Sequence, residues 1–173
     1  ADWPFGYDDL EPFYARAEEL FEEASRRNMR VIAGLTGIDR NAPAEFIDTP
    51  ENFYRDSKRL IAQYHNKGRN LYAITPRFAF GASPELLKAC QRLKHEHPDC
   101  WVNTHISENP AECSGVLVEH PDRQDYLGVY EKFAPSLGES LKRAELERRR
   151  LYGFANHEVV TLYVGSSTGL RLR

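Results

Sequence analysis

Two short apolar stretches of this chain each end in side chains that are capable of chemistry. Residues 71–78 end in Arg77 and Phe78, and residues 101–108 end in His105-Ile-Ser-Glu108. Parallel α/β folds build their active sites at the carboxyl ends of the strands. The sequence therefore predicts that these four side chains gather at one edge of a sheet.

The His105 and Glu108 pair is suited to hydrolysis. A neutral imidazole at a strand end can bind a metal ion, and a nearby carboxylate can move protons to or from a water molecule and its substrate. The spacing alone has low specificity, because a surface or hydrogen-bonded His and Glu pair is the more common arrangement. The interpretation therefore depends on what the neighbouring strand contributes.

Arg77 and Phe78 supply that neighbouring strand end. A planar guanidinium group beside an aromatic face can hold a flat heteroaromatic ligand that has a carbonyl acceptor. The alternative is a salt-bridged arginine next to a core phenylalanine. The ligand-binding interpretation is favoured because His105 and Glu108 are expected beside it.

Other candidate metal ligands are weaker. His95-Glu-His97 has the spacing of a metal-binding pair, but it lies at the end of a charged helix just before Pro98, which favours solvated histidines. The three cysteines have no CxxC spacing, so neither a disulfide framework nor a cysteine zinc site is indicated.

The composition narrows the class of protein. With 173 residues and a formal net charge of -3, the chain is long enough for one ordinary domain and is not basic enough for a general nucleic-acid binder. No apolar run approaches the roughly 20 residues that span a bilayer, and the first residues lack the order of a signal peptide. We expect a soluble protein, cytoplasmic by default, with no nucleic-acid or membrane partner.

Strands and helices must alternate along the chain to position the candidate residues. Strands are predicted at residues 30–35, 70–75 and 100–105. Helices are predicted at residues 10–24, 51–66 and 84–97, with a further start and capping box at 109–112. This alternation indicates right-handed βαβ units and a parallel sheet. After Phe133 we expect a short charged helix and an antiparallel hairpin at 157–172.

The N-terminal helix is predicted from a single apolar stripe. Its members are spaced three or four residues apart, which is typical of an amphipathic helix. The stripe consists of Leu10, Phe13, Tyr14, Ala17, Leu20, Phe21 and Ala24.

Three spaced motifs resemble the guanine deaminases of the amidohydrolase superfamily. The motifs lie at residues 32–43, 75–78 and 104–109, and the resemblance runs from about residue 20 to 133. It implies an α/β fold that is part of a (β/α) barrel, with about three parallel strands, and an activity that converts guanine and water to xanthine and ammonia. It also implies that His105 is a zinc ligand, Glu108 the proton shuttle, and Arg77 and Phe78 the purine contacts.

The resemblance further implies metal ligands that this sequence does not display. The family holds its metal also with an HxH pair on the first strand, a histidine on the sixth and an aspartate on the eighth. Residues 1–19 are instead similar to a segment of glucose-methanol-choline oxidoreductases. Residues 134–173 are similar to the N-terminal part of TldD/PmbA-type metallopeptidases, without their HExxxH motif.

These observations lead to a hypothesis with two rivals. The leading hypothesis is a composite chain of three segments, 1–19, 20–133 and 134–173, that has no catalytic activity because its metal site is incomplete and that binds no cofactor. The first rival is a zinc-dependent guanine deaminase, with guanine or another purine as its ligand. The missing ligands would then come from another chain or from His65, His95, His97, His120 or His157. The second rival is a non-catalytic scaffold that self-associates through an acidic N-terminus and a basic C-terminus.

Overall fold

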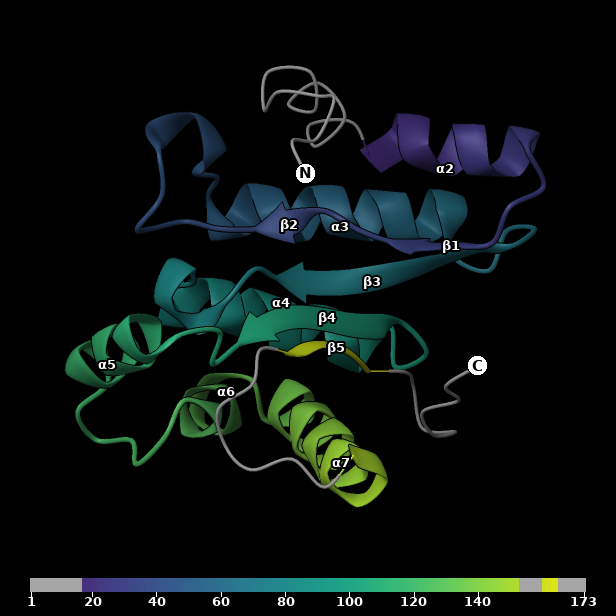
Figure 1. Ribbon diagram of the computed structural model, residues 1–173. Helices are drawn as coiled ribbons and strands as arrows, with labels where there is room; N and C mark the ends of the chain where they lie inside the picture. Colours follow the sequence, from purple (N-terminus) through teal and green to yellow (C-terminus); the bar gives the residue numbers. More distant parts are fainter. Residues whose placement is uncertain (1–16, 153–159, 165–173) are drawn as a thin grey trace, which may run out of the picture.

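The computed structural model describes residues 17–152 and 160–164 (Figure 1). The elements follow one another in an alternating α/β order. They are α2 (Ala17–Arg26), β1 (Val31–Ala33), β2 (Thr36–Gly37), η1 (Ala44–Phe46), α3 (Pro50–Tyr64), β3 (Asn70–Pro76), η2 (Ala79–Gly81), α4 (Pro84–Glu96), β4 (Trp101–Ile106), α5 (Pro110–Glu119), α6 (Leu127–Phe133), α7 (Pro135–Tyr152) and β5 (Val160–Val164).

Strand β3 lies at the centre of the sheet. It pairs in parallel with β1 and β2 on one side and with β4 on the other. The order across the sheet is β1-β3-β4-β5, and β5 pairs antiparallel with β4. The predicted α/β fold with about three parallel strands is confirmed. It is a partial barrel, because a complete (β/α)8 barrel has eight parallel strands.

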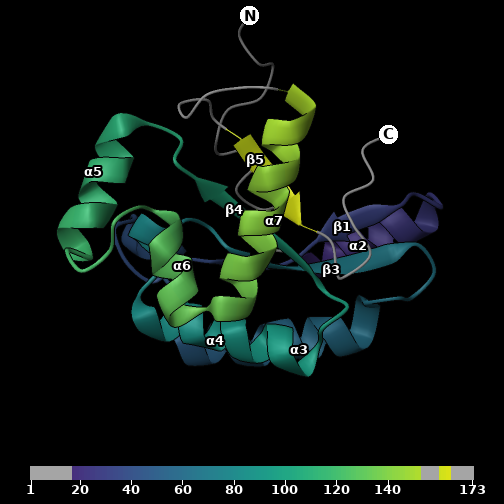
Figure 2. The same ribbon diagram turned by 90° about the horizontal axis from the view of Figure 1, so that it is seen from below.

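Helices α3 and α4 connect the parallel strands and cover one face of the sheet. Both lie behind the strands in Figure 1 and on one side of β3 in Figure 2. Each begins at a capped end with proline in its first turn: Thr49 accepts a hydrogen bond from the Asn52 amide, and Ser83 from the Leu86 amide. The predicted start of α4 is therefore confirmed.

The core lies between this face of the sheet and the helices. Strand β3 is buried along nearly its whole length, as expected for a central parallel strand. The largest side chains with almost no exposed surface are Phe21, Phe53, Leu60, Tyr72, Ile74, Leu86, Leu87, Leu93, Val102, Tyr130, Leu137 and Leu141.

The two ends of the chain differ in detail from the prediction. In α2, Phe21 and Ala24 are buried, but Leu20 is 48% exposed, so it does not belong to the core stripe. The C-terminal helix was expected to be short, yet α7 has 18 residues. The predicted hairpin lies largely outside the described residues. Its described part, β5, pairs with β4.

No helix in the described part of the chain is long and apolar enough to cross a membrane.

Candidate functional site

Backbone hydrogen bonds align the carboxyl ends of β2, β3 and β4. The Arg77 amide donates to the Gly37 carbonyl at 2.9 Å, and the His105 amide donates to the Arg77 carbonyl at 2.8 Å. Arg77 and His105 therefore lie next to each other at one edge of the sheet. This is the left edge in Figure 1, where β3 and β4 end and α5 lies.

The imidazole of His105 makes a second bond to the same carbonyl. Its Nδ1 lies 3.0 Å from the Arg77 oxygen. Because a carbonyl oxygen only accepts, Nδ1 carries the proton and Nε2 keeps its lone pair. A carbonyl that fixes the tautomer in this way is a common support for a metal-binding histidine. His105 is thus fit to bind a metal through Nε2.

Arg77 and Phe78 form a stacked pair. Arg77 is exposed, and its guanidinium carbon lies 5.4 Å from the centre of the half-buried Phe78 ring. Within the described residues Arg77 makes no ion pair, so the alternative of a salt-bridged arginine does not hold there. The arrangement leaves hydrogen-bond donors beside an aromatic face.

The position of the Phe78 ring requires a residue without a side chain at position 81. It packs against the Phe80 ring with centres 6.2 Å apart. A methyl group at Gly81 would lie only 2.4 Å from the edge of the Phe78 ring. Glycine at position 81 therefore makes room for the ring.

Glu108 follows His105 across a tight backbone turn. Ser107 has a φ of 57°, a left-handed conformation that costs a non-glycine residue on the order of 1–3 kcal/mol. The turn leads from β4 into α5, whose first turn is capped by the Asn109 side chain, which accepts from the Glu112 amide at 2.9 Å. Glu108 is half-buried within this turn.

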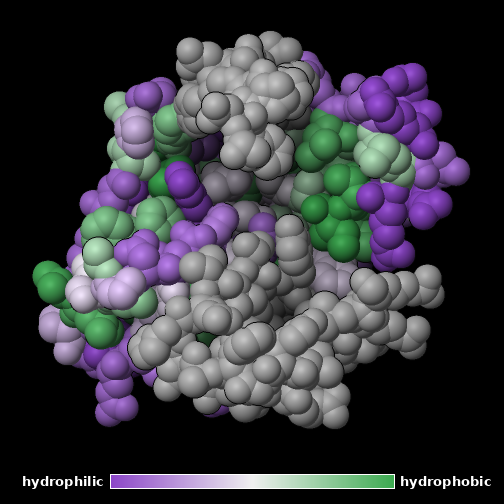
Figure 3. Space-filling view, in the orientation of Figure 1, coloured by the Kyte–Doolittle hydropathy of each residue, from purple (hydrophilic) through white to green (hydrophobic). Residues whose placement is uncertain are grey.

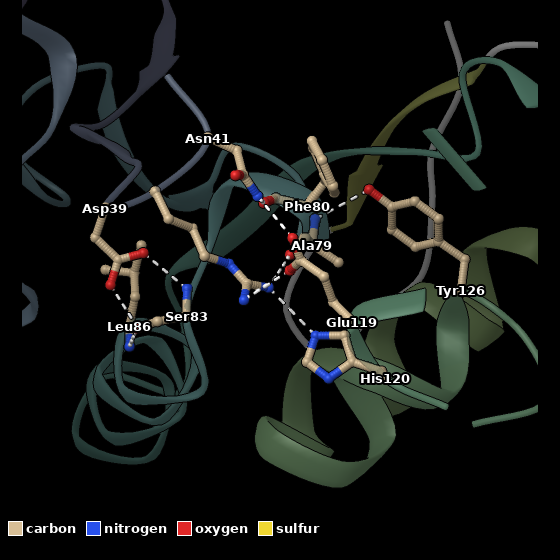
Figure 4. Close-up of polar contacts among 10 residues, drawn as sticks. Asp39, Asn41, Ala79, Phe80, Ser83, Leu86, Glu119, His120 and Tyr126 are labelled. Carbon is tan, nitrogen blue, oxygen red and sulfur yellow. Dashed lines mark hydrogen bonds and ion pairs between the residues drawn. The ribbon is translucent and has the colours of Figure 1, made fainter. Parts of the chain in front are cut away.

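A polar network joins the surrounding loops (Figure 4). Asp39 accepts from the backbone and side chain of Ser83 and so fixes the start of α4. Arg40 forms an ion pair with Glu119 at 2.7 Å and donates to the Ala79 carbonyl at 3.1 Å. The loop after β2, the η2 turn and the end of α5 are therefore tied together.

His120 belongs to the same network. Its Nε2 lies 3.3 Å from an Arg40 nitrogen, and an arginine can only donate, so Nε2 accepts. Burial, followed by the nearby Arg40 charge, lowers the pKa of His120. The lone pair of Nε2 is already used in this arrangement, so His120 does not replace a missing metal ligand there.

A second cluster of possible metal ligands lies at the opposite edge of the sheet. His65, Asp99 and Cys100 are the described residues that bring three such atoms together. However, His65 Nδ1 accepts from the Tyr72 amide at 2.9 Å, and its Nε2 lies 3.0 Å from Asp99. Neither ring nitrogen has a free lone pair, and burial raises the pKa of the Cys100 thiol to about 12. We interpret the cluster as structural.

The remaining histidines do not extend the site. His95 is exposed, as expected, whereas His97 at the C-cap of α4 is half-buried and its Nε2 is buried without a hydrogen-bond partner among the described residues, so it is not the solvated histidine that was expected. His157 lies outside the described residues. The sequence did not single out Arg40 or Tyr126, and it offered His120 only as a possible metal ligand, although each of the three bonds a residue far away in the chain.

Comparison with known proteins identifies relatives of this chain. A model of the amidohydrolase family matches residues 9–153. Guanine deaminase of Escherichia coli (strain K12) is 52% identical over 116 residues, which are 67% of this chain and 26% of that protein. The family match crosses both boundaries drawn at residues 20 and 133.

Solved structures agree with the sequence comparison. A crystal structure of guanine deaminase from Bradyrhizobium japonicum is 95% identical, with a TM-score of 0.67 over 69% of this chain and 26% of that one. Guanine deaminase from C. acetobutylicum, solved with guanine in its active site, is 26% identical, with a TM-score of 0.64 over 70% of this chain and 29% of that one. The chain thus spans about a quarter of the length of these relatives.

The leading hypothesis from the sequence, a chain without catalytic activity, is wrong. The relatives are guanine deaminases, which favours the rival hypothesis of that activity. The absence of the other metal ligands from this sequence does not indicate inactivity. Since the chain matches only about a quarter of each relative, ligands from their other parts are not expected within the matched segment.

Proposed function

The chain belongs to the amidohydrolase family, and we propose that its function is the deamination of guanine to xanthine. The C2–N bond of the exocyclic amine breaks, a C2–O bond to water forms, and ammonia leaves. The curated relatives named guanine deaminase support this substrate, as does the structure of a relative with guanine bound.

The single observation that carries the proposal is the Arg77 carbonyl. It accepts hydrogen bonds from both the amide and the imidazole of His105. The residue that is proposed to hold the purine therefore also orients the residue that is proposed to bind the metal. Such shared support keeps substrate and metal in a fixed relation.

Arg77 and Phe78 are proposed to hold the purine. The guanidinium group donates to the carbonyl oxygen of guanine, and the Phe78 ring lies against the face of the heterocycle. Because Phe78 is supported by Phe80, the stacking surface is fixed before the ligand arrives. A preformed surface lowers the entropy cost of binding.

His105 is proposed to bind zinc through Nε2. When bound, the zinc ion supplies Lewis-acid activation of the attacking water. His105 is one ligand, whereas a catalytic zinc site normally has three protein ligands. The role of His105 is to present a nitrogen whose orientation is set by the Arg77 carbonyl.

Glu108 is proposed to move the proton. Its carboxylate takes a proton from the attacking water and delivers it to the leaving amine. Glu108 lies two residues beyond the end of β4, after the turn at Ser107, and this position near the carboxyl end of the strand supports the role. Its half-buried position limits competing contact with bulk water.

The test is guanine turnover by the chain after loading with zinc. Conversion of guanine to xanthine is followed by ultraviolet absorbance, and bound metal by elemental analysis. Glu108→Gln should lower kcat by about 10²–10⁴-fold, the usual contribution of general acid–base catalysis. Removing zinc with a chelator should abolish turnover, and adding zinc back should restore it.

Glu45→Gln is the matched control. Glu45 is an exposed carboxylate in η1 that makes no hydrogen bond or ion pair with the described residues, Arg77, His105 and Glu108 included, so its loss should leave kcat unchanged. The proposal is refuted if the zinc-loaded chain does not convert guanine, or if Glu108→Gln turns over as fast as the control.

The flanking segments carry a finer proposal. We infer that residues 1–19 and 134–173 contain segments similar to a glucose-methanol-choline oxidoreductase and to a TldD/PmbA-type metallopeptidase, although the amidohydrolase match includes residues 9–19 and 134–153 of them. The antiparallel pairing of β5 supports a separate origin of the tail, because neighbouring strands in a (β/α)8 barrel are parallel. This proposal requires that β1, β3 and β4 keep their pairing when the segment that contains β5 is removed.

A further inference from the structure

We propose that Tyr126 is a positioning residue that fixes the spacing between the loop carrying Phe78 and the turn carrying Glu108. The relevance of Tyr126 to catalysis rests on the proposed function, since Phe78 is assigned to the purine and Glu108 to proton transfer. The hydrogen bonds of its hydroxyl group are seen in the structure and do not depend on that function.

The hydroxyl group of Tyr126 bridges two segments that are far apart in sequence. It accepts a hydrogen bond from the Ala79 amide at 3.0 Å and donates one to the Glu112 carboxylate. Ala79 directly follows Phe78, and Figure 4 shows the Tyr126 hydroxyl pointing at it. Both hydrogen-bonding capacities of the hydroxyl are used to join η2 to α5.

Glu112 continues the connection to Glu108. Its amide donates to the Asn109 side chain at 2.9 Å, and Asn109 is the residue after Glu108. In a capping box the glutamate at this position reaches back to the N-cap amide. Here its carboxylate accepts from Tyr126, so a local capping residue is recruited to a contact with another helix.

Tyr126 is itself held firmly. It is 4% exposed and stacks on the fully buried Tyr130, with ring centres 6.3 Å apart and an angle of 20° between the planes. The Tyr130 hydroxyl lies 2.8 Å from that of Thr104. Thr104 precedes His105 in β4, so the tyrosine pair is anchored to the strand that carries the proposed metal ligand.

Both bonds require a protonated hydroxyl. Burial raises the pKa of Tyr126 far above its ordinary value, so the group stays neutral and keeps its proton. Phenylalanine has the same ring but can neither accept from Ala79 nor donate to Glu112. Tyr126→Phe therefore removes the bridge with little change in volume.

The experiment is hydrogen exchange on the full chain, read over residues 77–82 and 107–114. Tyr126→Phe should speed exchange about tenfold in both segments, because the Ala79 amide loses its partner and Glu112 is released. Glu112→Ala should speed exchange mainly in 107–114, whereas Glu112→Gln keeps an acceptor oxygen and should restore it. Adding Glu112→Ala to Tyr126→Phe should have little further effect in 107–114, because that connection is already broken.

Tyr64→Phe is the matched control. The Tyr64 hydroxyl also donates to a glutamate, Glu22, at 3.1 Å, but at the opposite edge of the sheet. Its loss should leave both segments unchanged even though it removes a similar bond. The inference is overturned if Tyr126→Phe leaves either segment as protected as in the wild-type chain, or if the control speeds exchange equally.

Guanine binding is measured on the same variants by equilibrium titration. If the exchange pattern is as expected and guanine binds, Tyr126→Phe should also weaken guanine binding several-fold, because the Phe78 loop is no longer fixed. If the pattern is as expected and guanine does not bind, the bridge stands and the purine assignment falls. Failure of the bridge and failure of the proposed function are thus separate results.

Discussion

The Arg77 carbonyl determines what the His105 imidazole can do. By accepting from Nδ1 it fixes one tautomer and leaves Nε2 to face a ligand. The Thr104 hydroxyl lies 3.2 Å from the same oxygen, which already accepts from the amide and the imidazole of His105. The chemistry at this edge is therefore set by a backbone atom, whose position depends on strand register rather than on side-chain type.

Gly81→Ala should weaken guanine binding while the fold persists. The added methyl group would lie 2.4 Å from the Phe78 ring, which must then move. Besides this movement of the Phe78 ring, the buried Ile38 side chain, at 3.2 Å, must yield, so the unfolding free energy should fall by about 1–3 kcal/mol, as is typical of overpacking. The dissociation constant for guanine, measured by equilibrium titration, should rise about tenfold.

Gly128→Ala is the comparison for this change. A methyl group at Gly128 comes no closer than 3.4 Å to another atom, which is ordinary contact. Guanine affinity should be unaffected in that variant. Equal affinity of Gly81→Ala and the wild-type chain would show that the Phe78 ring does not contact the purine.

The candidate residues at the strand ends could be predicted from the sequence. The residues that hold them in place through long-range contacts could not. Arg77 and His105 follow apolar runs, so the alternating pattern was enough to place them at one edge. The contact of Tyr126 with Ala79 joins positions 47 residues apart. No local pattern encodes such a contact, because it depends on how α6 packs against η2.

At the level of elements, three loops at this edge are held by one arginine. Arg40 bonds Glu119 at the end of α5 and the Ala79 carbonyl in η2. Asn41, its neighbour, donates to the Phe80 carbonyl at 2.6 Å and to Glu119 at 2.9 Å. The loop after β2 thus fixes both segments that flank the candidate site.

Acid should loosen this connection through His120. Its folded pKa is lowered below the ordinary value of 6.5, first by burial and then by Arg40, with Lys132 acting in the same direction and Glu119 and Asp122 opposing. The unfolded chain therefore binds the proton first as pH falls, and stability is lost as pH falls through about 6.5. Urea unfolding at pH 7.5 and 5.5 measures this loss.

His120→Gln should remove much of the pH dependence. The glutamine oxygen can accept from Arg40 but does not titrate in this range. The substitution should cost about 1 kcal/mol at pH 7.5, as is common for a buried change, and the further loss at pH 5.5 should shrink. An unchanged difference between the two pH values would exclude His120 as the source.

The elements that carry their own start signals were predicted well. Ser83-Pro84 and Asn109-Pro110 supply a side-chain cap and a proline at the first helical position, and both helices begin there. Helix α6 was missed, because it has seven residues and its N-cap position, Tyr126, makes no side-chain cap. The pairing of β5 with β4 was also missed, since the choice of strand partner is a long-range event.

At the scale of the whole molecule, the two outer sides of the sheet, along β4 and along β1, differ in what covers them. β5 covers the outer edge of β4 along a register from Val102 to Ile106. β1 ends the described sheet on the other side, and apolar residues gather near this edge in Figure 3. Met29, just before β1, is 55% exposed, and Leu20 in the adjacent α2 is 48% exposed. Uncovered apolar edges favour association with other chains.

Removal of residues 153–173 should expose the outer edge of β4. β4 would then present unpaired amide and carbonyl groups, which act as a template for pairing with another chain. Sedimentation velocity over a range of concentrations should show self-association of the shortened chain at concentrations where the full chain does not associate. The pairing of β1, β3 and β4 should persist, because their connections through α3 and α4 are untouched.

Leu162→Pro in the full chain separates edge exposure from loss of mass. Proline lacks the amide hydrogen and is poorly tolerated within a paired strand, so β5 should detach from β4 while the length is kept. The variant should self-associate like the shortened chain. If both variants sediment as the full chain does, β5 does not protect the β4 edge. If the shortened chain self-associates and Leu162→Pro does not, the pairing of β5 is not what prevents association. The other deleted residues would then protect the β4 edge.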